Sequence, residues 1–177
     1  MIANAEIGSV VRRYLEDHPG ERARLALLLA ELGNARPLWS RSTSPGHVTC
    51  SAAVISDAGR VLMIHHKALS RWLLPGGHLD EADSSLAVAA ARELLEETGI
   101  PAVPVAGLPA DIDVHTIPAN PAKGEPQHWH ADFCWVMRAT AGEIRLQEEE
   151  VTGHGWRGPA ELPAPLLAAK LARGWRK

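Results

Sequence analysis

The segment Arg92 to Ile100, RELLEETGI, constrains this chain more than any other part of its sequence. If the segment is helical, at about 100° per residue, the carboxylates of Glu93, Glu96 and Glu97 share one face. Like charges one turn apart repel each other and cost roughly 0.2–0.5 kcal/mol for each pair. The segment therefore needs either water around its three carboxylates or a cation between them.

Apolar side chains occupy the opposite side of the same predicted helix. On a helical wheel they lie about 100° to 220° away from Glu93. They are Ala87, Val88, Ala91, Leu94 and Leu95. We expect this face to pack against a sheet, with Ser84 or Ser85 as the N-cap and Gly99 as the stop.

The carboxylate cluster and the turn before it suit a metal ion. Oxygen ligands of this kind favour Mg²⁺ or Mn²⁺, which often share their coordination with substrate phosphates. Arg92 lies beside the carboxylates and could hold one of them in place. At Gly76 and Gly77, backbone groups are free to meet an ion or a phosphate. The alternative is a solvated acidic helix face, which is common.

Residues 76–100 resemble the Nudix box of the Nudix (MutT-like) hydrolase superfamily. That motif has Gly, five residues, Glu, seven residues, then Arg-Glu-apolar-x-Glu-Glu-x-Gly-apolar. Its second half matches at Arg92, Glu93, Leu94, Glu96, Glu97, Gly99 and Ile100. The first half has Asp83 where the family has Glu, and one extra residue before Arg92. Loops tolerate such insertions, and the helix register is kept.

The resemblance covers roughly residues 47 to 170 and implies a fold. The family fold is an α/β/α sandwich around a mixed β-sheet. We therefore expect an N-terminal helical extension and linker at residues 1–46 and a Nudix hydrolase domain at residues 47–177.

The resemblance also implies an activity and its residues. Nudix hydrolases cleave a nucleoside diphosphate linked to another moiety by attack of water on phosphorus. Mg²⁺ or Mn²⁺ would bind at Glu93, Glu96 and Glu97, and the carbonyl of Gly77 or its neighbour would complete the coordination. Catalytic roles would fall on Glu96 and Arg92. The acidic run QEEEV offers Glu148, Glu149 and Glu150 as a general base, and we choose Glu150 because it precedes an apolar strand.

Two predicted strands carry rows of polar side chains. In HWHADFCWVM, period-two alternation places His128, His130 and Asp132 on one face and large apolar side chains on the other. In DIDVH the same alternation places His115 on a polar face. Imidazoles two residues apart on a strand can bind one metal ion or hold a phosphate. A hydrated face of an edge sheet explains the rows equally well.

Two residues that flank the glycine turn are further candidates for contact with a substrate. Trp72 could stack on a base, although a Trp at a strand end usually packs. His78 could touch the substrate, although a lone His is more often incidental. Together with Gly76 and the polar rows, they form our predicted substrate-binding set.

Composition excludes several other classes of protein. With 177 residues, 46 % of them apolar, the chain suits one ordinary domain with a sizeable core. A net charge of -3 without a basic stripe argues against nucleic acid as a large partner. Cys50 and Cys134 fit buried free thiols in a reducing compartment. We expect a cytoplasmic protein without a secretory signal or a membrane span.

Local patterns predict the other elements. Helices are expected up to about residue 36, the second from Glu21 to Leu32. Strands are expected at 47–55 and 60–66 as a hairpin around SDAG, at 110–117 and 127–139 around a proline-rich loop, and, shorter, at 142–147 and 151–158, before a C-terminal helix.

Two other functions remain open at this point. An isoprenyl-diphosphate isomerase shares the fold and would need a cysteine in its pocket, for which Cys134 is the candidate. A non-catalytic Nudix-fold sensor would have no need of the intact carboxylate cluster. The N-terminal helices could cap the cleft or form the interface of a homodimer.

Overall fold

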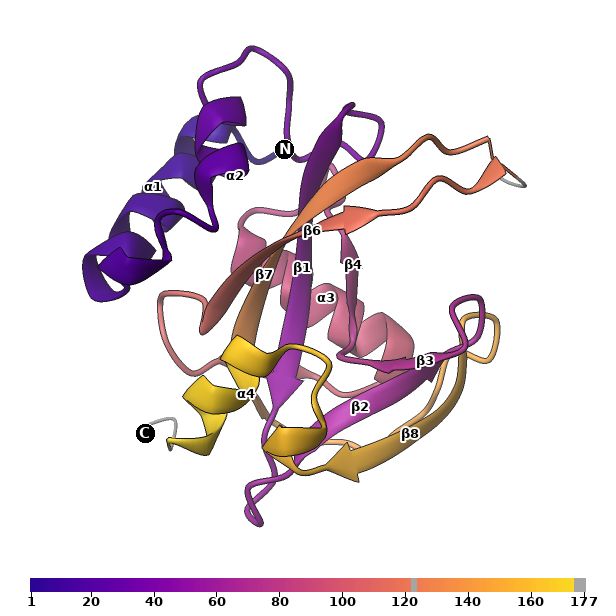
Figure 1. Cartoon of the computed structure of the whole chain (residues 1–177). Helices are drawn as coiled ribbons and strands as arrows, with labels where there is room; N and C mark the ends of the chain where they lie inside the picture. The colour runs from indigo at the N-terminus through magenta and orange to yellow at the C-terminus, as the bar shows by residue number, and fades with distance from the viewer. Residues whose placement is uncertain (122–123, 174–177) are drawn as a thin grey trace.

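The computed structural model describes residues 1–121 and 124–173; residues 122–123 of the proline-rich loop and the last four residues of the expected domain lie outside the described part (Figure 1). Its elements are α1 (Asn4–Asp17), η1 (Pro19–Glu21), α2 (Ala26–Glu31), β1 (Gly46–Val54), β2 (Val61–His66), β3 (Arg71–Leu73), β4 (Gly76–His78), α3 (Leu86–Thr98), β5 (Ala102–Pro104), β6 (Asp111–Ile117), β7 (His128–Ala139), β8 (Val151–Arg157), η3 (Pro159–Glu161) and α4 (Pro165–Ala172).

Two sheets form the centre of the molecule. The larger has the order β4-β1-β7-β5, with β6 also paired to β7, and the smaller has the order β3-β2-β8. β1 runs parallel to β7, whereas β4, β5 and β6 pair with their neighbours antiparallel. The larger sheet is therefore mixed, as expected.

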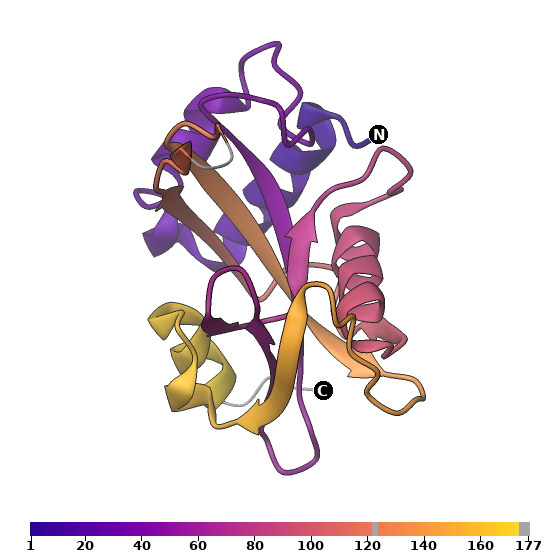
Figure 2. The ribbon, with the colours of Figure 1, turned by 90° about the vertical axis from the view of Figure 1, so that its right-hand side faces the viewer.

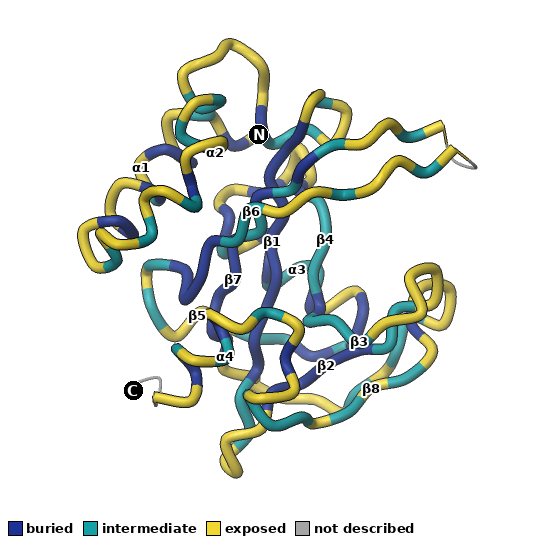
Figure 3. The backbone as a smooth tube through the Cα atoms, viewed as in Figure 1, coloured by how far each residue is buried: buried dark blue, intermediate teal, exposed yellow. Residues whose placement is uncertain are grey.

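Helices cover both faces of this mixed sheet. α1, α2 and α3 share one core with alternate residues of β1 and β7. α4 packs with β2 on a second core formed by the other residues of these strands. Figure 2 shows α3 and α4 on opposite sides of β1, and Figure 3 shows burial concentrated in β1 and β7. The expected α/β/α sandwich is confirmed.

The expected hairpin of β1 and β2 is only a turn. Ile55 and Val61 form a single bridge, and the amide of Ser56 donates to the carbonyl of Arg60 over 2.8 Å. Beyond the turn the strands enter different sheets. β1 is buried along its whole length, so its backbone must pair on both sides, and β4 and β7 provide those partners. β2 is left to pair with β3 and β8.

Two other local expectations were wrong. Residues 142–147 form no strand; their amides bind the end of α3, with Arg145 donating to the Thr98 carbonyl over 2.7 Å. The second helix begins at Ala26 rather than Glu21, because Pro19 and Gly20 direct the chain into a 3₁₀ turn first.

The N-terminal helices pack tightly on the larger sheet. Tyr14 of α1 is buried, and its hydroxyl donates to Asp111 over 3.2 Å. Arg24 lies 3.2 Å from the same Asp111 carboxylate, and Lys170 of α4 lies 2.8 Å from it. Lys170 also reaches Glu21 over 2.8 Å. One buried ionic cluster therefore joins α1, the segment before α2, β6 and α4.

No helix within residues 1–121 and 124–173 combines the length and the apolar character that crossing a bilayer would need.

Candidate active site

α3 begins and ends at strong local signals. Of the two candidate caps, Ser85 caps the helix, and its side chain accepts from the Val88 amide over 3.2 Å. Gly99 ends the helix with a φ of 70°, in the left-handed region that glycine adopts without strain.

The face that α3 buries differs from the wheel prediction. Val88 and Leu95 were expected to pack, but they are 45 % and 48 % exposed. Leu94 is buried as expected, and Ala89, Ala90 and Glu97 lie inward beside it. Small alanines let the helix approach β1 closely, and the backbone amide that binds Glu97 fixes the rotation of the helix.

The three carboxylates of α3 occupy different environments. Glu97 is only 3 % exposed, and it accepts from the Gly76 amide over 2.8 Å. Burial, together with the negative charges of Glu93 and Glu150, raises the pKa of Glu97 to about 8. Burial also raises the pKa of Glu93. Glu96 is exposed. The inner two carboxylates therefore lack the stabilisation that water gives the third.

Arg92 connects the two halves of the motif. It donates to Asp83 over 3.1 and 3.0 Å, to Glu93 over 3.1 Å and to Glu96 over 3.0 Å. It also donates to the carbonyl of His78 over 2.9 Å. Asp83 is buried. Its two contacts with Arg92 show that this shorter side chain still reaches the arginine in spite of the extra residue in the loop.

Both glycines of the turn are needed for close approach. A Cβ at Gly76 would lie 2.5 Å from the carbonyl of Cys50, and one at Gly77 would lie 2.7 Å from Oε2 of Glu93. These residues begin β4, which pairs with Thr49–Ser51 of β1. A side chain at either position would force the turn away from β1 or from Glu93. The two glycines therefore allow the turn to lie directly against the carboxylates.

Glu150 comes to this cluster from a distant part of the chain. The Gln147 amide donates to the carbonyl of Glu97 over 3.2 Å, and the Lys67 amide donates to the carbonyl of Glu150 over 2.8 Å. The negative charge of Glu150 raises the pKa of both Glu93 and Glu97. The acidic turn is therefore held beside α3.

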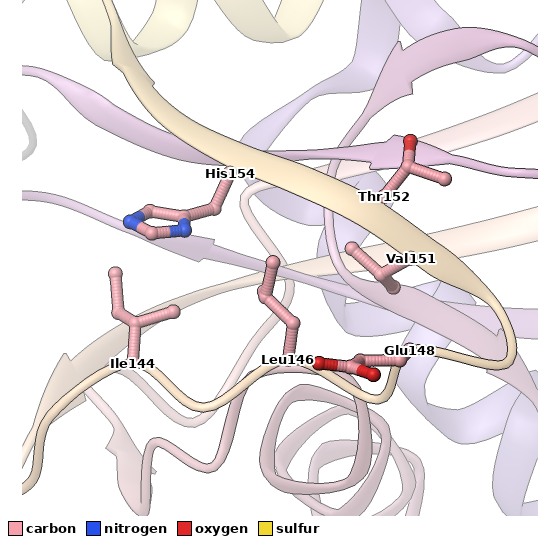
Figure 4. Close-up of a pocket in the computed structure, with 6 residues that line it drawn as sticks. All are labelled: Ile144, Leu146, Glu148, Val151, Thr152 and His154. Atoms are coloured by element: carbon pink, nitrogen blue, oxygen red, sulfur yellow. The ribbon is translucent and has the colours of Figure 1, made fainter.

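An open hollow of about 480 Å³ lies beside β8 (Figure 4). It is lined by Ile144, Leu146, Glu148, Val151, Thr152 and His154. None of the predicted site residues lines this hollow, although Glu148 belongs to the same acidic turn as Glu150. The hollow is therefore distinct from the carboxylate cluster.

Histidines gather on the polar face of the larger sheet. The parallel pairing of β1 and β7 sets His47 opposite His130, and the pairing of β6 and β7 sets His115 opposite the same residue. The ring centroid of His47 lies 4.6 Å from that of His130, 5.3 Å from that of His128 and 5.1 Å from that of His78.

The sequence analysis did not select His47. Its signal was the alternation of His47, Thr49 and Ser51, three polar residues on one face of a strand that is otherwise apolar. The same period-two pattern identified His128 and His130. The pairing with β7 then brought the two polar rows together.

Burial and hydrogen bonds set the charge of these side chains. Burial lowers the pKa of His78 to about 4 and also lowers that of His47 and His130, which are neutral at pH 7. A 2.9 Å contact with Asp113 raises the pKa of His115. His47, His78 and His130 are therefore ready to accept a ligand through a lone pair.

Asp132 and Trp72 have partners of their own. Asp132 accepts from the hydroxyls of Thr49 over 3.0 Å and Ser51 over 2.6 Å, and burial raises its pKa. Trp72 lies on β3 of the smaller sheet, and the guanidinium carbon of Arg157 lies 4.5 Å from its ring centroid. The carboxylate of Asp132 thus faces strand hydroxyls, and one face of Trp72 is covered by a cation.

The chain is thus an α/β protein in which a glycine turn of a mixed sheet lies against a helix that bears three carboxylates. Residues 45–176 match the model of the NUDIX domain. This match spans more than half of the chain, and the chain belongs to the Nudix family.

Curated relatives cover part of the chain. It is 33 % identical over 122 residues to a probable DHNTP pyrophosphohydrolase of Lactococcus lactis, spanning 69 % of this chain and 64 % of that protein. It is 32 % identical over 110 residues to a putative 8-oxo-dGTP diphosphatase of Bacillus subtilis, spanning 62 % and 65 %. Phosphatase NudJ of Escherichia coli is 52 % identical over 62 residues, spanning 33 % and 38 %. The chain thus spans less than two thirds of these relatives.

Solved structures support the same fold. A MutT NUDIX hydrolase from Burkholderia pseudomallei is 27 % identical, with a TM-score of 0.52 over 72 % of this chain and 96 % of that one. A NUDIX-family hydrolase from Clostridium perfringens, 20 % identical, has a TM-score of 0.53 over 72 % and 97 %. The second likeness concerns the fold alone.

Proposed function

We propose that this protein is a divalent-metal-dependent pyrophosphohydrolase. It would cleave the diphosphate bond of a nucleoside diphosphate linked to another moiety, by attack of water on phosphorus. The observation that carries the proposal is Glu97, a buried carboxylate held by the Gly76 amide and paired with no basic side chain in the described part of the chain. The names of the curated relatives, pyrophosphohydrolase and diphosphatase, support this reaction class.

The carboxylate cluster fits a hard divalent cation. Burial raises the pKa of Glu93 and Glu97. Of the three carboxylates of α3, Arg92 pairs with Glu93 and Glu96 but not with Glu97. Mg²⁺ or Mn²⁺ would be held by Glu93, Glu96 and Glu97, with the carbonyl of Gly77 beside them. When bound, such an ion neutralises a diphosphate and lowers the pKa of a bound water.

The surrounding residues hold this site in place. Arg92 fixes the directions of Glu93 and Glu96, and the Gly76 amide fixes Glu97. Glu150 is our candidate general base, because its carboxylate is near enough to raise the pKa of both inner carboxylates. It would take the proton of the attacking water.

The polar face of the larger sheet would hold the rest of the substrate. β4 leads directly from the carboxylates to this face, because His78 follows Gly77 and its ring lies 5.3 Å from that of His130. We assign contacts with a small nucleotide derivative to His78, His115, His128 and His130. Asp132 would orient these contacts through the strand hydroxyls, and Trp72 would contact the substrate only with its uncovered side.

The position of Cys134 does not support the hypothesis of an isoprenyl-diphosphate isomerase. Its side chain is 3 % exposed and packs in the second core with Val136 and Leu167. Burial raises the pKa of this thiol. Cys134 follows His130 and Asp132 on the same face of β7, but its side chain is covered by the second core and not exposed to a substrate.

The test is hydrolysis of a panel of diphosphate-linked substrates, with Mg²⁺, with Mn²⁺ and with chelator. The panel includes nucleotide sugars, ADP-ribose, dinucleoside polyphosphates and modified nucleoside triphosphates. We expect metal-dependent product release that falls by several orders of magnitude in Glu97→Gln. Glu16→Gln is the matched control, since Glu16 is an exposed carboxylate of α1, outside the site. No turnover on any substrate, with binding unchanged in Glu97→Gln, would favour the sensor.

A further inference from the structure

We infer that His47, His128 and His130 form a second metal site, separate from the carboxylate cluster, which takes a transition-metal ion of the Zn²⁺ type. One ring nitrogen from each of the three residues lies within 4.8 Å of the other two. His47 comes from β1, and the other two come from β7, two residues apart on the same face. The three imidazoles therefore converge on one point above the larger sheet.

An unpaired buried nitrogen points to a ligand at this place. His47 is 3 % exposed, and its Nε2 has no hydrogen-bond partner among the described residues. Buried polar atoms are almost always paired in folded proteins, so a lone one requires an explanation. A bound cation between the three rings supplies the missing partner.

The other nitrogens are arranged as in metal-binding histidines. Nδ1 of His128 lies 2.9 Å from the carbonyl of Pro126, and Nδ1 of His47 lies 3.4 Å from that of Thr43. A proton on each Nδ1 leaves the lone pair on Nε2. Ligand histidines commonly donate their other N–H to a backbone carbonyl in this way, which fixes both the tautomer and the ring direction.

One distance already matches a shared ion. Nε2 of His128 lies 3.1 Å from Nε2 of His130. Two nitrogens that are each about 2.1 Å from one ion stand about 3.0 Å apart at a right angle and about 3.4 Å apart at the tetrahedral angle. A hydrogen bond between these two rings would explain their contact but would leave His47 unpaired. One ligand shared by the three rings accounts for both the short contact and the unpaired nitrogen.

The donor set selects the class of ion. Three imidazole nitrogens, without a thiolate, favour Zn²⁺, Co²⁺ or Ni²⁺ over Mg²⁺, which prefers oxygen. Three protein ligands also leave a coordination position open, as in catalytic zinc sites rather than closed structural ones. His78, whose ring lies 5.1 Å from that of His47, borders this position from the side of the carboxylate cluster.

The test is metal binding, measured independently of hydrolysis. Chelator-treated protein is titrated with Zn²⁺ against a chromogenic chelator, and with Co²⁺ while its visible absorption is recorded. We expect one equivalent of Zn²⁺ in the wild type, with an affinity reduced roughly 10²-fold or more in His128→Ala and in His130→Ala. His154→Ala, in an exposed histidine of β8, is the matched control and keeps full affinity.

Glu97→Gln separates the two sites. It should abolish hydrolysis but keep the Zn²⁺ equivalent and the Co²⁺ spectrum. Far-UV circular dichroism of the metal-free variants verifies their fold, and His128→Gln serves as a second, less disruptive substitution. Loss of Zn²⁺ in Glu97→Gln alone, unchanged affinity in the histidine variants, or no Zn²⁺ binding by the wild type would each overturn the inference.

Discussion

Glu93, Glu96 and Glu97 lie within five residues of each other, yet they experience three different environments. Glu97 is buried and bound by a backbone amide, Glu93 is partly buried beside Arg92, and Glu96 faces water. A carboxylate that is buried without a cation favours its neutral form. Titration and close packing are therefore the properties to test at the scale of single residues.

The stability of the metal-free protein should fall as pH rises from about 5 to about 8. The pKa of Glu97 is about 8 in the folded protein and near 4.5 when unfolded, so in this window the unfolded chain releases a proton that the folded protein retains. The linked loss is roughly 1–3 kcal/mol. Urea unfolding at several pH values, with chelator present, measures it.

Glu97→Gln is the reference for this pH dependence. The difference between wild type and variant isolates the carboxyl group from other titrating residues. A wild-type slope equal to that of Glu97→Gln across the window would contradict the raised pKa. Mg²⁺ should reduce the slope, because a bound cation stabilises the ionised carboxylate.

Gly77→Ala should impair hydrolysis more than folding. The added Cβ would lie 2.7 Å from the Glu93 carboxylate, which must move. A displaced ligand group lowers the rate roughly 10- to 100-fold, as measured by steady-state turnover. Gly107→Ala is the control, since nothing lies within 4 Å of a Cβ there. Equal rates in both variants would show that the close approach is unimportant.

At the scale of elements, one arginine fixes α3 to the loop before it. Arg92 binds Asp83 through two nitrogens and reaches the carbonyl of His78. Asp83 lies in the segment that departs from the family motif by one residue. The helix and its loop are therefore joined by a planar, directional contact that lysine cannot reproduce.

Arg92→Lys should destabilise the protein by roughly 2–3 kcal/mol, because Asp83 would remain buried with a poorer partner. Arg36→Lys is the control, since its pair with Glu31 involves an arginine side chain that is 51 % exposed, and it should cost under about 1 kcal/mol. Thermal and urea unfolding measure both values. A loss for Arg92→Lys no larger than for the control would rule out the structural role of this contact.

At the scale of the whole molecule, the N-terminal helices and α4 meet at Asp111. This residue receives Tyr14, Arg24 and Lys170 from three separate parts of the chain. Together with the shared core, it joins residues 1–46 to the sheet that carries the site. We therefore expect the two parts to unfold together.

Asp111→Ala should destabilise the whole chain by roughly 1–3 kcal/mol, because Arg24 and Lys170 each lose one carboxylate partner but keep Glu21. Unfolding should remain one transition when followed by tryptophan fluorescence and by far-UV circular dichroism. Asp57→Ala, in an exposed turn, should have little effect. Two separate transitions in the wild type would show that residues 1–46 form an independent unit.

Features that depend on local order could be predicted from the amino-acid sequence. Caps and helical periodicity placed α3 and its carboxylates, and period-two alternation placed His128 and His130 on one face. Helical periodicity did not predict that Val88 and Leu95 would be exposed. A helical wheel does not say which part of an apolar face a sheet will cover.

The tertiary structure alone decided what distant segments share. It separated β1 from β2, brought Glu150 to α3 and set His47 opposite His130. These outcomes depend on strand pairing between segments far apart in the chain, which is settled by burying apolar faces and satisfying backbone hydrogen bonds together. A local pattern determines which residues share a face, and only the assembled core determines which faces meet.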